Sequence, residues 1–356
     1  MNSMVALRVW RTALPILVGV TAACGGRASN GSADTSQDGG VGLQDTGGEV
    51  SEGGSTSRVV ADGQGNIGQL AAYGESIYWS TDNTVRRALK RSGTAETLLS
   101  TTSTTNELHF DAGFMYWIDG VPFRASIEGG VSTKLATAPS STPHLAISNG
   151  TLYWATTWGD MFAMPETGGP TQTLVGSIAP PVGLAADNRS LFWIAIVAGA
   201  DAGSRQRPAL MQMSRDGSTA PALLTRVDAD YFSLGRHPLL LDEAATYWLD
   251  YGSGSGGSDG GKTHIWRIPK TGGSFAIVAS ADKMGAFAID DAYVYWTEPR
   301  AGVVRRAAKS GSAAETLFDG QLGASAIAVD DTSVYWSTLA TDGRGGSVLA
   351  GSKTPR

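Results

Sequence analysis

An aromatic residue followed by Trp recurs seven times along this chain of 356 residues. Successive motif Trp residues are 38, 37, 39, 55, 48 and 40 positions apart. Self-similarity at a period of roughly 20 to 50 residues is typical of proteins that stack one supersecondary unit per period. The chain is therefore predicted to contain seven repeated units. Their motifs are Tyr78-Trp79, Tyr116-Trp117, Tyr153-Trp154, Phe192-Trp193, Tyr247-Trp248, Tyr295-Trp296 and Tyr335-Trp336.

Each unit has the pattern of four short strands. A short apolar segment such as Leu145-Ala146-Ile147 precedes the aromatic pair, and segments such as 84–88 and 96–99 follow it. Such apolar runs, separated by polar or Gly-rich turns, are typical of buried strands. Four antiparallel strands per period predict an all-β fold, a seven-bladed β-propeller. In five units an Asp follows the first apolar segment, where its side chain can bond nearby backbone amides in a turn; these are Asp111, Asp187, Asp242, Asp290 and Asp330.

The two ends of the repeat region complement one another. The seventh unit stops after its third predicted strand, at 348–353, whereas segment 57–62 resembles the missing fourth strand. An open ring would leave a strand edge available for pairing with other chains. We therefore expect the N-terminal strand to complete the last blade and close the ring, so that the propeller covers 57–356.

The repeats resemble the YWTD propeller repeats of low-density-lipoprotein-receptor-type proteins. The likeness rests on the aromatic-Trp pair, the upstream Asp, and segments such as 78–82 (YWSTD) and 295–298 (YWTE). It covers roughly 57–356 and implies a β-propeller. That family usually has six blades where this sequence has seven units, and the resemblance transfers no ligand.

The N-terminus has the features of an export signal. Residues 1–23 combine Arg8 and Arg11 with an apolar run and end in small residues before Cys24, as in secretory signal peptides. This end resembles the lipobox of bacterial lipoproteins, so Cys24, the only Cys, is the expected lipidation site. An ordinary signal peptide with an incidental Cys is the alternative. Residues 24–56 are poor in large apolar residues and are expected to be a disordered tether. We expect an exported protein, lipid-anchored in the cell envelope at the outer membrane or cell surface.

Charge argues against one class of partner. The formal net charge is −6, which is unfavourable for a broad nucleic-acid-binding face. The small basic clusters at 86–91 and 305–309 are interpreted as solvated strand edges that discourage aggregation.

Departures from the repeat indicate where a binding face could lie. Two insertions, 197–208 and 250–262, fall between the second and third strands of their units, and the connection 225–237 is also enlarged. All three are expected on one rim, and irregular loops on a rigid scaffold often carry function. Arg and aromatic residues dominate binding hot spots. The candidate binding residues are Trp158, Tyr231, Phe232, Arg236 and His237.

A second candidate site is the mouth of the central channel. Alignment of the units places Glu107 and His144 at equivalent positions entering the innermost strands, with His237 one residue earlier in its unit. They could form a polar constellation, or hold a divalent metal. The sequence has no tight ligand spacing, and the common hydrolase, metalloprotease and phosphate-loop motifs are missing.

Two hypotheses of function follow. The first is a non-enzymatic, lipid-anchored propeller without a cofactor that binds a protein, a peptide or a cell-wall glycan, and the missing catalytic motifs favour it. The alternative is a lyase or hydrolase acting at the channel mouth, with Glu107, His144 or His237 as base or metal ligand. Its architecture is similar to that of virginiamycin B lyase, but a shared fold does not establish a shared function.

Overall fold

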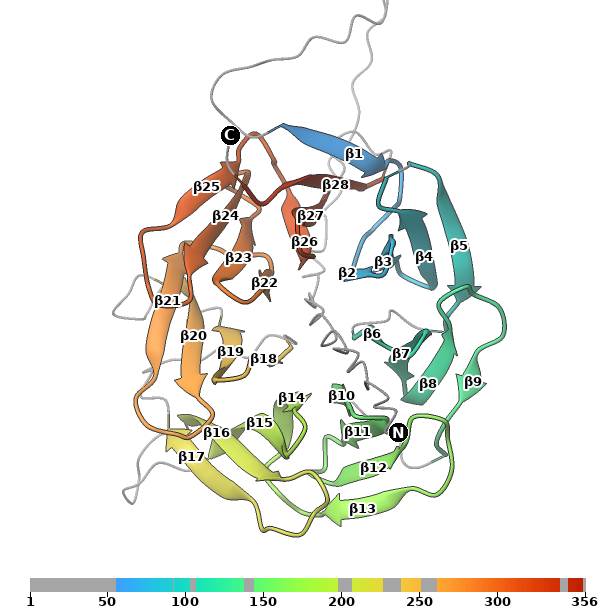
Figure 1. The fold of residues 1–356 in the computed structure, drawn as a ribbon, viewed down its shortest axis with the longest axis vertical. Coiled ribbons are helices and arrows are strands. Elements are labelled where there is room, and N and C mark those ends of the chain that lie inside the picture. The colour runs from blue at the N-terminus through green and yellow to red at the C-terminus, as the bar shows by residue number, and fades with distance from the viewer. Residues whose placement is uncertain are drawn as a thin grey trace, which may run out of the picture.

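The computed structural model describes residues 56–91, 93–102, 107–137, 144–197, 207–226, 238–250, 261–339 and 345–354. These residues form seven antiparallel sheets of four strands each, arranged radially as a seven-bladed β-propeller (Figure 1). In each blade the first strand lies innermost and the fourth outermost (Figure 1). No helix in these ranges is long and apolar enough to span a membrane.

The predicted units correspond one to one to the blades. Blades 1 to 3 are β2 (Gln69–Tyr73), β3 (Ser76–Ser80), β4 (Thr84–Leu89), β5 (Ala95–Ser100); β6 (His109–Asp111), β7 (Phe114–Asp119), β8 (Val121–Ser126), β9 (Thr133–Lys134); and β10 (His144–Ser148), β11 (Thr151–Ala155), β12 (Met161–Pro165), β13 (Gln172–Val175). Blades 4 and 5 are β14 (Pro181–Ala186), β15 (Ser190–Val197), β16 (Arg207–Ser214), β17 (Ala222–Arg226); and β18 (Leu240–Leu241), β19 (Ala245–Asp250), β20 (Thr263–Pro269), β21 (Ala276–Ala281).

The last two blades complete the ring. Blade 6 is β22 (Phe287–Ile289), β23 (Tyr293–Glu298), β24 (Val303–Ala308) and β25 (Glu315–Phe318). Blade 7 contains β26 (Ala324–Val329), β27 (Ser333–Thr338) and β28 (Ser347–Ser352), and its outermost strand is β1 (Ser57–Ala61). Strand β1 pairs antiparallel with β28, from Ser57 opposite Gly351 to Ala61 opposite Val348. The expectation that the N-terminal strand closes the ring is confirmed.

The aromatic pair explains how neighbouring blades pack. Successive residues of a strand point to opposite faces of the sheet, so the two aromatic side chains of one motif face two different neighbours. Tyr78 packs in a cluster with Trp117 of blade 2, while Trp79 packs with Tyr335 of blade 7. The same pairing recurs at every junction in the described residues, giving seven buried clusters. Each motif therefore contributes to two interfaces, and the ring is held by equivalent apolar contacts.

In four blades, the Asp predicted after the first apolar segment forms the hairpin turn between the first and second strands. Oδ1 of Asp187, Asp242, Asp290 and Asp330 accepts the backbone amides two and three residues further on, at 2.8–3.0 Å. Asp111 makes no such turn. Its hairpin runs through Ala112 and Gly113, which both have positive φ, 46° and 82°, as a two-residue type I′ turn requires.

Candidate functional site

The most exposed tryptophan lies on a short turn at the end of blade 3. The turn 156–160 joins β11 to β12, and Trp158 on it is 72% exposed. Its base is fixed by Thr156, whose hydroxyl accepts the amides of Trp158 at 3.3 Å and of Asp160 at 3.1 Å. The described residues include every other Trp of 57–356, and all of those are buried.

The same turn packs closely against the connection between β13 and β14, which leads to blade 4. Gly159 has φ of 84°, and a Cβ there would lie 1.8 Å from the carbonyl oxygen of Ile178. Ile178 donates its amide to the Gly159 carbonyl at 3.1 Å, and Ser177 donates its amide to Asp160 Oδ1 at 3.2 Å. Only Gly permits this close approach at positive φ. The indole of Trp158 is thus displayed on a preorganised backbone, which lowers the ordering cost of binding.

Other parts of the predicted rim share this end of the propeller. The enlarged connections between β15 and β16 and between β19 and β20 join second to third strands, as the turn of Trp158 does, so topology places all three at the same end. Most of both connections, and the candidate residues Tyr231, Phe232, Arg236 and His237, lie outside the described residues, as does Cys24.

The structure brings Glu107 and His144 together. Both side chains are buried, and His144 Nδ1 lies 2.7 Å from Glu107 Oε1. The second carboxylate oxygen, Oε2, accepts the backbone amide of Leu145 at 2.7 Å, and His109 Nε2 lies 3.8 Å from it. Glu107 precedes the first strand of blade 2 and His144 begins the first strand of blade 3. The carboxylate therefore joins two neighbouring blades.

Blade 1 has an uncharged counterpart of this contact. Gln69, at the position equivalent to Glu107, accepts the Leu108 amide at 2.6 Å and donates to the Leu108 carbonyl at 3.1 Å. Leu108 is in turn equivalent to Leu145. In two successive blades, a side chain at this position thus bonds the innermost segment of the next blade. The contacts of Glu107 with His144 and Leu145 are called the interblade clasp below.

The environment of Glu107 keeps it ionised. Burial alone would raise its pKa, but the charge of His144 and the hydrogen bonds from His109 and His144 outweigh burial and lower the pKa to about 2. A carboxylate with so low a pKa is a weak proton acceptor at neutral pH. Within the described ranges, no three His, Cys, Asp or Glu side chains are grouped so that they could hold a metal ion.

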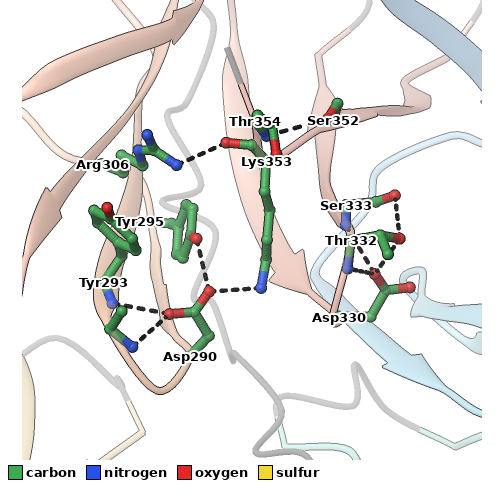
Figure 2. A network of polar contacts seen from close by, with 11 residues as sticks. Asp290, Tyr293, Tyr295, Arg306, Asp330, Thr332, Ser333, Ser352, Lys353 and Thr354 are labelled. Atoms are coloured by element: carbon green, nitrogen blue, oxygen red, sulfur yellow. Dashed lines mark hydrogen bonds and ion pairs between the residues drawn. The ribbon is translucent and has the colours of Figure 1, made fainter.

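Ion pairs at four of the blade junctions were not predicted from the sequence. At four junctions a Lys following the third strand of one blade bonds the turn Asp of the preceding blade (Figure 2 shows Lys353 with Asp290). The Nζ to Oδ2 distances are 2.6–2.7 Å, and each Lys side chain is at most 16% exposed. The four pairs are Lys90 with Asp330, Lys270 with Asp187, Lys309 with Asp242, and Lys353 with Asp290.

The interpretation of the basic clusters as solvated strand edges was wrong for their central members. Lys90 and Lys309 are partners in the ion pairs, and Arg87 and Arg306 bond both a Glu of their own blade and a carbonyl of the next. The lysines lie beside the acidic turn of the preceding blade and the arginines beside a carbonyl of the next blade, which explains why these side chains are mostly buried. Each Asp of these pairs has a lowered pKa, since the bonds to Lys and to backbone amides outweigh burial.

The junction of blades 2 and 3 departs from this pattern. Glu166 occupies the position that Lys holds elsewhere, and its pKa is raised by burial and by the nearby charge of Asp111. Arg124 donates to the Glu166 carbonyl at 2.9 Å. This junction therefore lacks the Asp–Lys ion pair that is present at four others.

No family model matches the chain, and no curated protein matches it. Solved structures do. A chain of the nidogen/laminin complex, a YWTD-type β-propeller, aligns with a TM-score of 0.53 at 18% identity, over 72% of this chain and 98% of that one. The WD40 domain of Neurospora crassa Pan2 and oligogalacturonate lyase of Vibrio parahaemolyticus give TM-scores of 0.60 and 0.57, each at 9% identity over 85% of this chain and 97% of the other.

These structures include a protein in complex with a protein partner and an enzyme. At such low identities the likeness concerns the fold alone, because propellers host many unrelated functions. Together with the seven blades and their aromatic-Trp repeats, it identifies the chain as a β-propeller similar in fold to the YWTD type.

Proposed function

We propose that this protein is a non-enzymatic propeller that binds a protein, peptide or glycan through the loop face that displays Trp158. The observation that carries the proposal is an indole 72% exposed on a turn fixed by Thr156, Gly159 and Asp160. A large exposed aromatic side chain on a rigid backbone is typical of a binding hot spot. The binding of laminin by a propeller in the nidogen complex supports the class of function.

The catalytic alternative draws less support from the described geometry. It requires Glu107 or His144 to act as base or metal ligand. Both oxygens of Glu107 are already occupied by His144 and by the Leu145 amide. The likeness to oligogalacturonate lyase is one of fold.

The tryptophan provides its own test of the binding face. In a Trp10→Phe background, acrylamide should quench mainly the emission of Trp158, and Trp158→Phe should remove that component. Ligands selected from a displayed peptide library and a glycan array on the full chain should protect Trp158 from quenching. Trp158→Ala should weaken their binding by a factor of about 30 or more, as for a hot spot of ~2 kcal/mol.

A matched control is available at the opposite end of the blades. Val131 is 91% exposed in the connection between β8 and β9, which joins third to fourth strands. Val131→Ala should leave binding of the same ligands unchanged. If Trp158→Ala and Val131→Ala bind equally well, the loop face of blade 3 is not the binding surface.

We also propose that the protein is exported and anchored in the cell envelope by a lipid on Cys24, with 24–56 as the tether. The support is the lipobox-like end of the signal sequence. In a bacterial host, labelled palmitate should be incorporated into the wild-type chain and not into Cys24→Ala, which should be released from the membrane fraction. Equal labelling of both proteins would contradict the anchor.

A further inference from the structure

Four blades carry an Arg at the same position of the third strand, opposite the Tyr of the aromatic-Trp motif. The cross-strand pairs are Tyr78 with Arg87, Tyr116 with Arg124, Tyr247 with Arg267, and Tyr295 with Arg306. Since these arginines lie in equivalent backbone positions, their partners can be compared directly.

Three of the four arginines find partners within the protein. Arg87 bonds Glu96 at 2.6 Å and the Ile127 carbonyl at 2.9 Å. Arg306 lies 2.8 Å from Glu315, donates to the Lys353 carbonyl at 2.7 Å, and lies 4.3 Å from the centre of the Tyr293 ring. Arg124 donates to the Glu166 carbonyl and lies 4.9 Å from the centre of the Phe114 ring.

Arg267 of blade 5 lacks each of these partners. The residue opposite it on the fourth strand is Ala276, where blades 1 and 6 have Glu96 and Glu315. On the second strand Ala245 occupies the position of the Phe114 and Tyr293 rings. The hydrogen bond of Arg267 in the described residues runs from Nε to the Tyr247 hydroxyl, at 3.2 Å. The two terminal nitrogens of its guanidinium have no hydrogen-bond partner among these residues.

A groove lies beside Arg267 and Ala276. It has a volume of about 400 Å³ and is lined by Arg267, Ala276, Ile277 and Val278 of blade 5 and by Lys309 to Gly311 of blade 6, a size that suits a small ligand group. The charge of Lys309 is neutralised by Asp242 at 2.7 Å. Asp242 and Asp291 also line the groove, so its formal charges balance, but neither forms an ion pair with Arg267 within the described residues. Among the described residues, the guanidinium of Arg267 is therefore the cation of this groove that has no carboxylate partner.

We propose that the groove between blades 5 and 6 binds a glutamate side chain of an acidic peptide, with its carboxylate on the guanidinium of Arg267. Blades 1 and 6 show the same contact made internally, by Glu96 and Glu315, at 2.6 and 2.8 Å. Arg presents a planar fork that matches a carboxylate. The exposed Ile277 can contact the aliphatic part of the side chain. This site lies at the end of the blades opposite to Trp158 and is independent of the proposed binding face.

The test uses the full chain and a hexaglutamate peptide with blocked termini, so that only side chains supply carboxylates. Fluorescence anisotropy at low salt should show saturable binding, and a blocked hexaglutamine peptide should not bind. Arg267→Gln should weaken binding at least about tenfold, the effect expected for loss of a charge-assisted pair.

Ala276→Glu is the matched variant. It retains Arg267 but supplies an internal carboxylate that can occupy the guanidinium, as Glu96 and Glu315 do in blades 1 and 6. The variant should therefore fold, and its affinity for hexaglutamate should fall at least about tenfold. Thermal unfolding of both variants checks that the fold is retained. The proposal is wrong if the wild type fails to bind hexaglutamate, or if both variants bind it as the wild type does. It is also wrong in its ligand class if trigalacturonate binds through Arg267 and hexaglutamate does not.

Discussion

Deleting strand β1 is expected to abolish cooperative folding of the propeller. A chain beginning at Gly63 loses the whole outer strand of blade 7, whereas one beginning at Ser57 retains it. The deletion leaves the edge of β28 unpaired and removes Val60, which is fully buried, together with Ala61. Loss of these side chains and of the ladder hydrogen bonds costs on the order of 5 kcal/mol, comparable to the whole stability of many domains.

The measurement is denaturant unfolding of the two chains, followed by the fluorescence of the buried Trp residues. A third chain tests whether closure itself is responsible. Residues 57–61 can be moved behind residue 354 through a short turn, because Ser57 pairs with Gly351 next to the end of β28. This rearranged chain should regain most of the stability. If the chain beginning at Gly63 unfolds at the same denaturant concentration as the chain beginning at Ser57, ring closure by β1 does not contribute to stability.

The fold could be predicted because its main signal is local and repeated. Each motif such as Tyr78-Trp79 fixes which residues of a strand point to the two neighbouring blades, and seven motifs fix the number of blades. The closing strand at 57–61 was predictable because the seventh unit lacked a fourth strand. The insertions likewise fall between second and third strands, as β15 and β16 show.

The polar junctions could not be predicted in the same way, because they join residues of different blades. Lys353 and Asp290 are 63 positions apart, and Lys90 and Asp330 meet only because the ring closes. Within a blade the sequence does carry a signal for the arginine partners. Glu96 and Glu315 follow Arg87 and Arg306 by nine positions, and the corresponding place after Arg267 is Ala276.

Replacement of Glu107 by Ala is expected to destabilise the propeller by about 3 kcal/mol, because two buried groups lose their acceptor and each costs about 1–3 kcal/mol when left unpaired. The change leaves His144 and the Leu145 amide buried without their acceptor. Glu107→Gln should cost less, because Gln69 makes the equivalent contact to Leu108 with an amide, but it still loses the contribution of the charge. Chemical denaturation of the three proteins at neutral pH gives these differences.

The pH dependence of stability distinguishes the contribution of the Glu107 charge from that of its side-chain shape. Its pKa is lowered to about 2 in the folded protein from an ordinary value of 4.5. Because the folded pKa is the lower one, the stabilisation is fully present above about pH 4.5 and is lost as the pH falls towards 2. Its full size is on the order of 3 kcal/mol. The wild type should therefore lose more stability than Glu107→Gln between pH 5 and pH 2.

The result also bears on the catalytic alternative. An interblade clasp predicts that Glu107→Ala lowers stability and that Glu107→Gln restores part of it, with ligand binding at the Trp158 face unchanged in the folded fraction. A general base predicts the reverse: both variants fold with nearly wild-type stability and both lose turnover, because an amide cannot accept the proton. Near wild-type stability of Glu107→Ala would thus remove the structural role that its contacts with His144 and Leu145 indicate.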